Sequence, residues 1–160
     1  MKPEEKLVKL LKEKKMTVTT AESCTGGLIA KRITDISGSS SVFECGIVSY
    51  SNRIKSEILG VSEETLAKYG AVSEQTAREM VSGALNVSGA DIAVSVTGIA
   101  GPDSDGTDKP VGLVYIAVSD GKNTIVKKYL NSFTEDIRQN NRNKSADEAL
   151  NMILERLSDE

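Results

Sequence analysis

Residues 17–36 have the sequence TVTTAESCTGGLIAKRITDI, and this stretch decides the fold. Residues 17–21 are rich in β-branched side chains, and an apolar helical spacing begins at Leu28. A short polar turn with two glycines lies between them. The stretch therefore predicts a strand, a tight turn and a helix start. Free backbone N–H groups and the positive end of the helix dipole are available there to hold an anion or an oxyanion.

The spacing of apolar residues predicts the remaining elements. Helices are expected over 4–15, 27–36, 52–58, 62–70, 74–86 and 146–157, and strands over 17–21, 42–50, 92–97, 112–119 and 124–130. Residues 120–123, with the sequence DGKN, predict a hairpin turn between the last two strands. Helices flank the early strands and a hairpin comes late. We therefore expect an α/β fold, a single three-layer α/β/α domain with a mixed β-sheet over residues 1–160.

Composition narrows the classes of function. The chain is 39% apolar over 160 residues, which is enough for one globular core. Its 20 basic and 23 acidic residues, with no Trp for base stacking, argue against a nucleic-acid partner. Two cysteines and no histidine argue against a disulfide framework and against a metal site. The start lacks a signal-peptide core and no apolar run spans a bilayer, so a cytoplasmic protein without membrane association is expected.

Two candidate nucleophiles, Ser23 and Cys24, lie in the glycine turn. Ser23 would attack from the end of a strand beside a helix start, but a serine hydroxyl needs a base to take its proton. The alternative for Ser23 is a structural role as an N-cap or turn residue, which serines often have before helices. Cys24 is the weaker candidate, because small buried thiols are commonly inert and no histidine is present to activate one.

Lys55 is the candidate base in a chain without imidazole. It follows the predicted strand that ends at Tyr50, and catalytic residues gather at strand ends in α/β sheets. A lysine acts as a general base only where burial or neighbouring positive charge lowers its pKa toward neutrality. Tyr50 would orient this lysine or relay a proton. The alternative is an ordinary solvated lysine on a helix.

Candidates for ligand binding lie at three further places. Thr97 and Gly98 end the buried strand and are typical of a small-molecule pocket rim, although a structural turn explains them nearly as well. Arg138 and Arg142 are four residues apart, so on a helix they share a face that suits a phosphate or a carboxylate. Solvated surface arginines are the alternative. Ser40 belongs either to a flexible turn or to the pocket.

Six ordered segments together resemble the CinA C-terminal domain family. They are residues 20–27 (TAESCTGG), 36–40 (ISGSS), 50–55 (YSNRIK), 70–74 (GAVSE), 97–102 (TGIAGP) and 109–112 (KPVG). The resemblance extends in order over residues 7–157, nearly the whole chain. It implies a serine amidohydrolase that needs no metal or other cofactor. The implied reaction converts nicotinamide mononucleotide (NMN) and water to nicotinic acid mononucleotide and ammonia, a step of pyridine nucleotide salvage.

The same resemblance assigns roles to residues. Lys55 matches the family's lysine and would deprotonate the serine, with Ser23 as the preferred nucleophile and Ser40 as the competing choice. Tyr50 and Thr97 would order the pocket. The backbone amides around Thr25, Gly26 and Gly27 would hold the tetrahedral oxyanion, and Arg138, with Arg142, would hold the phosphate of the nucleotide.

The family also implies a homo-oligomer, a dimer or larger. The alternative to an enzyme is a non-catalytic ligand-binding or interaction module linked to competence and DNA damage. Retention of a serine together with the lysine favours the enzyme.

Overall fold

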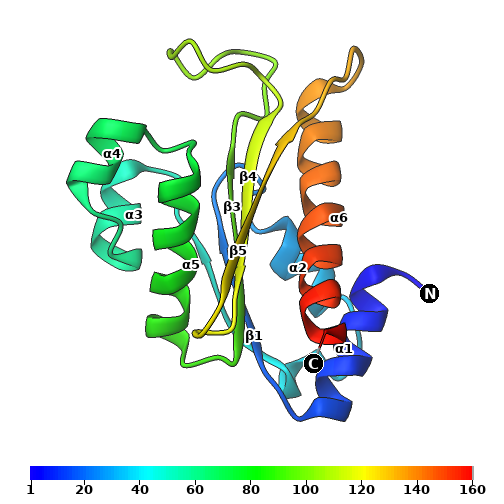
Figure 1. Ribbon diagram of the computed structural model, residues 1–160. Helices are drawn as coiled ribbons and strands as arrows, with labels where there is room; N and C mark the ends of the chain where they lie inside the picture. Colours follow the sequence, from blue (N-terminus) through cyan, green and yellow to red (C-terminus); the bar gives the residue numbers. More distant parts are fainter. Residues whose placement is uncertain (160) are drawn as a thin grey trace.

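A five-stranded mixed sheet forms the centre of the protein in the computed structural model, which describes residues 1–159 (Figure 1). Its strands are β1 (Val18–Glu22), β2 (Phe43–Val48), β3 (Ile92–Gly98), β4 (Leu113–Ser119) and β5 (Thr124–Leu130), in the spatial order β2-β1-β3-β4-β5. Strands β2, β1 and β3 are parallel, whereas β3, β4 and β5 pair antiparallel. The carboxyl ends of β1, β2 and β3 therefore lie at the same end of the sheet.

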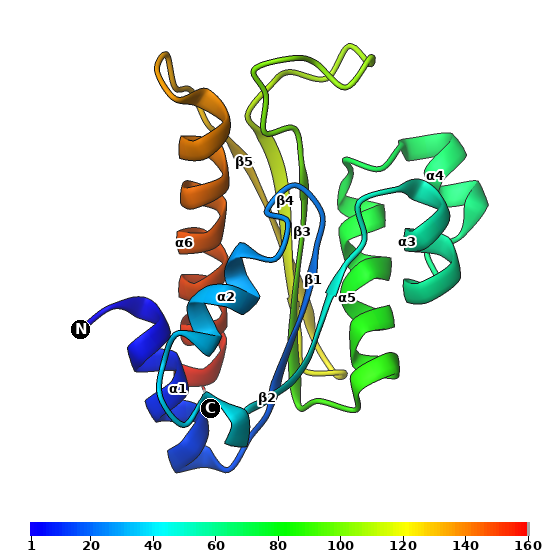
Figure 2. The same cartoon turned by 180° about the vertical axis from the view of Figure 1, so that it is seen from behind.

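Helices cover both faces of the sheet (Figure 2). Their bounds are α1 (Pro3–Lys14), α2 (Leu28–Thr34), α3 (Asn52–Leu59), α4 (Glu63–Tyr69), α5 (Glu74–Ser88) and α6 (Ile137–Ser158), and a short 3₁₀ helix, η1 (Ser39–Ser41), precedes β2. Helices α1, α2 and α6 form one layer, and α3, α4 and α5 form the other. The predicted three-layer α/β fold with a mixed sheet is confirmed.

The two helical layers pack on the sheet through side chains of different size. The layer of α1, α2 and α6 buries large aliphatic residues, among them Leu7, Ile29, Val94, Ile116 and Leu150. Between α5 and the sheet, the alanines Ala77 and Ala84 of the helix and Ala93 and Ala117 of the strands contribute beside larger residues such as Met80. Small side chains allow a close approach of helix and sheet, so α5 lies directly against β3 and β4.

A glycine of α5 sets the position of α3. Gly83 is buried, and a Cβ atom built on it would overlap the backbone carbonyl of Leu59 at the end of α3. Only a residue without a side chain allows the two helices to approach this closely. The position of α3 matters because this helix carries Lys55.

The predicted elements are present, and one of them is much longer than predicted. The last helix was expected over 146–157, but α6 begins at Ile137. Its first turns have no apolar stripe, because their buried positions hold the polar residues Asn141 and Ser145. Asn141 Nδ2 donates to the carbonyl of Ala100 at 2.7 Å, and Ser145 Oγ donates to the carbonyl of Asn141 at 2.7 Å. Hydrogen bonds of buried polar side chains, rather than burial of apolar ones, hold this part of the helix in place, so its hydrophobic pattern is weak.

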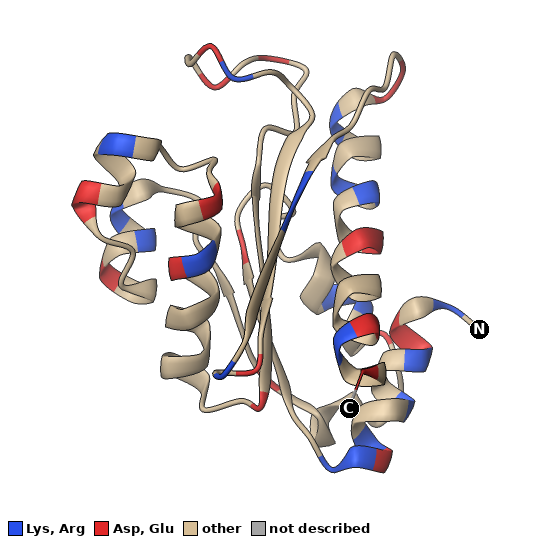
Figure 3. Cartoon of the chain, viewed as in Figure 1, with Lys and Arg blue, Asp and Glu red and all other residues tan. Residues whose placement is uncertain are grey.

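Charged residues of both signs are mixed over the helices and loops (Figure 3). The edge strand β5 carries Lys127 and Lys128, which is a common way to discourage pairing with another strand. Within residues 1–159, none of the helices combines the length and the apolar character needed to cross a membrane.

Candidate active site

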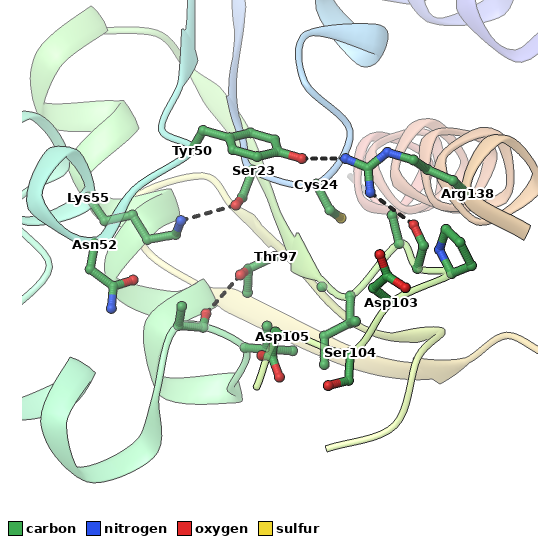
Figure 4. A pocket seen from close by; sticks show the side chains of 17 residues that line it. Ser23, Cys24, Tyr50, Asn52, Lys55, Thr97, Asp103, Ser104, Asp105 and Arg138 are labelled. Carbon is green, nitrogen blue, oxygen red and sulfur yellow. Dashed lines mark hydrogen bonds between the residues drawn. The ribbon is translucent and has the colours of Figure 1, made fainter. Parts of the chain in front are cut away.

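A pocket of about 490 Å³ lies at the carboxyl end of the three parallel strands (Figure 4). In α/β sheets this is the usual place for a ligand, because the loops after the strands converge there. The turn after β1, the segment after β2, the end of β3 with the loop that follows, and α6 all contribute to its wall. Its polar and charged lining residues are Ser23, Cys24, Tyr50, Asn52, Lys55, Thr97, Asp103, Ser104, Asp105 and Arg138.

Lys55 and Ser23 are in direct contact inside this pocket. Lys55 Nζ lies 3.0 Å from Ser23 Oγ, and the same nitrogen donates to the backbone carbonyl of Ser49 at 2.7 Å. Ser23 follows β1 and Lys55 lies on α3, so the fold brings together residues that are 32 positions apart. The Lys55 side chain is fully enclosed, with an exposed fraction of 2%. A buried amine next to a hydroxyl is the arrangement that a serine–lysine pair requires.

Burial shifts the pKa values of the neighbouring groups Lys55 and Cys24 in opposite directions, and it favours the neutral form of each. Desolvation lowers the pKa of Lys55 to about 8, against a weaker opposing effect of Cys24. The amine is therefore partly neutral near physiological pH and able to accept a proton. Desolvation raises the pKa of the Cys24 thiol to about 12, so Cys24 stays protonated and is a poor nucleophile.

The turn that carries Ser23 is shaped by its glycines and by an acid that the sequence did not single out. Gly26 and Gly27 have φ angles of 59° and 98°, which favour glycine. Gly27 is the N-cap of α2 and has no side chain with which to cap it. The Glu22 carboxylate does so instead, accepting from the amides of Ile29 at 2.9 Å and Ala30 at 3.1 Å. A glycine at the expected N-cap, five residues after an acid at the end of a predicted strand, is the signal that would have identified Glu22.

The structure separates the predicted oxyanion donors. The Gly26 amide donates to the carbonyl of Ser23 at 3.0 Å and is therefore occupied. The amides of Cys24, Thr25 and Gly27 have no acceptor within the part of the chain that the structure describes. Of these residues only Cys24 lines the pocket, while the Thr25 side chain is buried. The backbone amides without an acceptor that lie nearest to Ser23 in sequence are therefore those of Cys24 and Thr25.

The two predicted phosphate ligands occupy different surroundings. Arg138 lines the pocket and donates to the Tyr50 hydroxyl at 2.6 Å and to the carbonyl of Gly101 at 2.9 Å (Figure 4). Arg142 does not line the pocket. Its guanidinium donates to the carbonyls of Cys24 at 3.2 Å and Thr25 at 3.0 Å. Only Arg138 is placed to meet a ligand directly.

The remaining predicted residues divide between the pocket and another part of the fold. Thr97 and Gly98 line the pocket, and Thr97 Oγ1 donates to the carbonyl of Ala71 at 2.7 Å. Ser40 lies in η1, before the amino end of β2, whereas Lys55 follows the carboxyl end of that strand. Ser40 is exposed and does not line the pocket. The structure therefore brings Ser23, and not Ser40, to Lys55.

Two carboxylates of the pocket, and a lysine outside it that holds the same loop, were not predicted as site residues. Asp103 and Asp105 belong to the loop after β3 and add carboxylates to the wall that holds Arg138. Lys109, near the end of the same loop, donates to the carbonyls of Tyr69 and Val72, both at 2.6 Å, and so ties the loop to the end of α4 and to the segment before α5. Among residues 1–159, no cluster of three or more His, Cys, Asp or Glu side chains is placed to hold a metal ion.

Comparison with known proteins identifies the family. The family model described as the CinA C-terminal domain matches residues 1–157. The chain belongs to this family. Among its relatives, nicotinamide-nucleotide amidohydrolase PncC from Enterobacter agglomerans is 56% identical over 130 residues, which are 80% of this CinA C-terminal domain and 79% of that protein.

Other relatives of this CinA C-terminal domain are larger. A putative competence-damage inducible protein from Thermoanaerobacter sp. (strain X514) is 52% identical over 127 residues, 79% of this chain but 31% of that protein. The chain therefore spans about a third of the length of that relative. A crystal structure of competence/damage inducible protein CihA from Agrobacterium tumefaciens is 41% identical, with a TM-score of 0.91 over 98% of this chain and 93% of that one.

Proposed function

We propose that this CinA C-terminal domain hydrolyses the carboxamide of NMN to nicotinic acid mononucleotide and ammonia, with Ser23 as nucleophile and Lys55 as general base and acid. The observation that carries the proposal is the 3.0 Å contact between Lys55 Nζ and Ser23 Oγ. The lowered pKa of Lys55, about 8, supports a role in proton transfer. The name of the Enterobacter agglomerans relative, which covers most of the chain, supports the choice of reaction.

The acylation half of the reaction follows from this pair. Neutral Lys55 takes the proton of Ser23 Oγ as that oxygen attacks the carboxamide carbon and forms a tetrahedral intermediate. The Cys24 amide, whose residue lines the pocket, is the first donor that we propose for the oxyanion, and the Thr25 amide, which also has no acceptor among the described residues, is the second. Lys55 then gives its proton to the departing nitrogen, the C–N bond breaks, and ammonia leaves an ester on Ser23.

The deacylation half uses the same groups in the same order. Lys55, again neutral, takes a proton from a water molecule as the water oxygen attacks the ester carbon. The ester C–O bond breaks, Lys55 returns the proton to Ser23 Oγ, and nicotinic acid mononucleotide is released. Each cycle therefore consumes one water and leaves both residues in their starting states.

The charges of the pocket support a nucleotide with a cationic ring. The Arg138 guanidinium suits a phosphate, which accepts paired charge-assisted hydrogen bonds. Asp103 and Asp105 line the same pocket and suit the positive pyridinium ring of NMN. We propose that the reaction belongs to pyridine nucleotide salvage, takes place in the cytoplasm and is carried out by a homo-oligomer.

Ammonia release from NMN tests the proposal. We expect turnover by the unchanged protein, none by Ser23→Ala or Lys55→Ala, and full turnover by the matched control Ser40→Ala. Loss of activity in Ser40→Ala with activity retained in Ser23→Ala would reassign the nucleophile. Tight binding of NMN without any turnover would overturn the enzyme and indicate a non-catalytic ligand-binding module.

A further inference from the structure

The first turns of α6 contact all three loops that form the pocket. Arg138, Asn141 and Arg142 have the spacing i, i+3 and i+4, which places them on one face of the helix. Arg138 and Asn141 hold the loop after β3 through the carbonyls of Gly101 and Ala100, and Arg138 also holds Tyr50 after β2. Arg142 holds the turn after β1.

Arg142 differs from Arg138 because both of its hydrogen bonds reach the turn that carries the nucleophile. Its guanidinium donates to the carbonyls of Cys24 and Thr25, at 3.2 and 3.0 Å, from a half-buried position outside the pocket lining. We propose that Arg142 is a positioning residue for Ser23, and not a ligand of the substrate phosphate. This inference rests on the proposed function of Ser23.

Peptide geometry explains how a hydrogen bond to a backbone carbonyl can orient the N–H group that would donate to the oxyanion. In a trans peptide unit the carbonyl and the following N–H point in opposite directions. By holding the Cys24 carbonyl, Arg142 directs the Thr25 N–H away from α6, on the side opposite the guanidinium. A cationic partner on the carbonyl also polarises the peptide unit and strengthens this N–H as a donor to an oxyanion.

The second bond of Arg142 acts on Ser23 itself. The Thr25 carbonyl belongs to the peptide unit whose N–H is that of Gly26, and this N–H donates to the Ser23 carbonyl at 3.0 Å. Arg142 therefore orients the peptide unit that fixes the backbone of the nucleophile. Gly26 makes room for this contact, because a Cβ on it would lie 3.1 Å from Arg142 Nη2.

The same turn is held at its other end by Glu22, whose buried carboxylate accepts from the amides of Ile29 and Ala30. A cation thus holds the carbonyls of residues 24 and 25 and an anion holds the amides of residues 29 and 30, and neither side chain lines the pocket. Arg142 is the member of this pair whose role can be separated from the folding of α2.

The experiment compares Arg142→Ala and Arg142→Lys with the matched control Arg32→Ala. Arg32 is also partly buried and bonds to Glu4 and Asp147, but it does not touch the pocket or the turn. We expect Arg142→Ala to lower kcat about 100-fold, the size of effect seen when an oxyanion donor is lost. KM should stay within about twofold, as for a group that acts only in the transition state.

A comparison of two substrates separates a positioning role of Arg142 from a role in binding the phosphate. The kcat loss should be equal for NMN and for nicotinamide riboside, which has no phosphate. Arg142→Lys should recover part of the activity, because lysine can hold one of the two carbonyls. Arg32→Ala should lower the melting temperature but leave kcat within about twofold. A rise in KM for NMN alone would overturn the inference and make Arg142 a phosphate ligand, and an equal loss of kcat in Arg32→Ala would also overturn it.

A measurement that needs no substrate tests the role of Arg142 independently of the proposed enzyme activity. Hydrogen–deuterium exchange of a peptide covering residues 23–30 should be faster in Arg142→Ala than in the unchanged protein, and unaltered in Arg32→Ala. Unaltered exchange in Arg142→Ala would overturn the positioning role. An unchanged protein that releases no ammonia from NMN would overturn the proposed function, and the exchange result would still decide whether Arg142 holds the turn.

Discussion

The Tyr50 hydroxyl accepts a 2.6 Å hydrogen bond from the Arg138 guanidinium at the rim of the pocket. Tyr50 is 59% exposed, so water can replace either partner when the pair opens. Arg138 keeps its second bond, to the carbonyl of Gly101, and can turn its remaining N–H groups toward a ligand. The pair therefore places a guanidinium at the pocket before the substrate arrives, held by a neutral partner that a phosphate can displace.

Arg138→Ala should raise KM for NMN by about 10- to 100-fold, because a hydrogen bond to a charged group contributes about 1.5–3 kcal/mol. KM for nicotinamide riboside should stay nearly unchanged. Steady-state kinetics on both substrates checks this, with Tyr50→Phe as the control that removes only the phenol oxygen. An equal rise in KM for both substrates would show that Arg138 does not recognise the phosphate.

The pH dependence of kcat/KM should follow Lys55. The pKa of Lys55 is lowered to about 8, and the neutral amine is the active form. Activity should therefore rise with pH and level off above about pH 8, and at pH 7 it should be about a tenth of the plateau. Initial rates of ammonia release at low NMN between pH 6 and 9.5 measure the profile. A profile that is flat over this range would exclude Lys55 as the base.

Lys55→Met should make the protein more stable at pH 7 and inactive. Lowering the pKa from 10.5 to about 8 means that the fold disfavours the charged amine, by about 3 kcal/mol. The penalty is complete below pH 8 and disappears as pH rises from about 8 to 10.5, because only the unfolded chain is then protonated. Urea unfolding should show the stability difference between variant and parent shrinking over this range. A stability difference that does not change with pH would contradict the lowered pKa of Lys55.

Glu22→Ala should destabilise the fold by about 1–3 kcal/mol, because two amides at the start of α2 lose their acceptor in a buried site. Activity should fall as well, since Ser23 is the next residue. The matched control is Ser62→Ala, which removes the side chain that accepts from the Thr65 amide at the start of α4. That variant should lose about 1 kcal/mol in urea unfolding and keep its kcat. Equal kcat values in the two variants would show that Glu22 has no effect on the nucleophile.

The sequence predicted those features that depend on local pattern. Alternating and helical apolar spacing identified the strands and most helices, and the rule that ligands bind at strand ends directed attention to Ser23 and Lys55. Their contact is a consequence of β1 and β2 being parallel neighbours, so that the chain segments after them meet. The family resemblance supplied the pairing of a serine with a lysine, which composition alone left open.

What the sequence did not predict depends on polar contacts between distant segments. The early start of α6 has no apolar signature, since Asn141 is satisfied by the carbonyl of Ala100, 41 residues away. Arg138 and Arg142 look equivalent by spacing, yet one lines the pocket and the other bonds to carbonyls 117 and 118 residues earlier. No local pattern encodes such a partner. Ser40 and Ser23 likewise lie at opposite ends of the sheet, and only Ser23 is buried in the pocket.

The hydrogen bonds from α6 to the loops of the pocket have a consequence for folding during protein synthesis. The ribosome makes β1 and the turn after it more than a hundred residues before Arg142, whereas a domain generally folds as a unit. Until α6 leaves the exit tunnel, the turn after β1 lacks Arg142 and the loop after β3 lacks Asn141. We therefore expect the turn that carries Ser23 to reach its final geometry only after the first turns of α6 have been made and have packed against it.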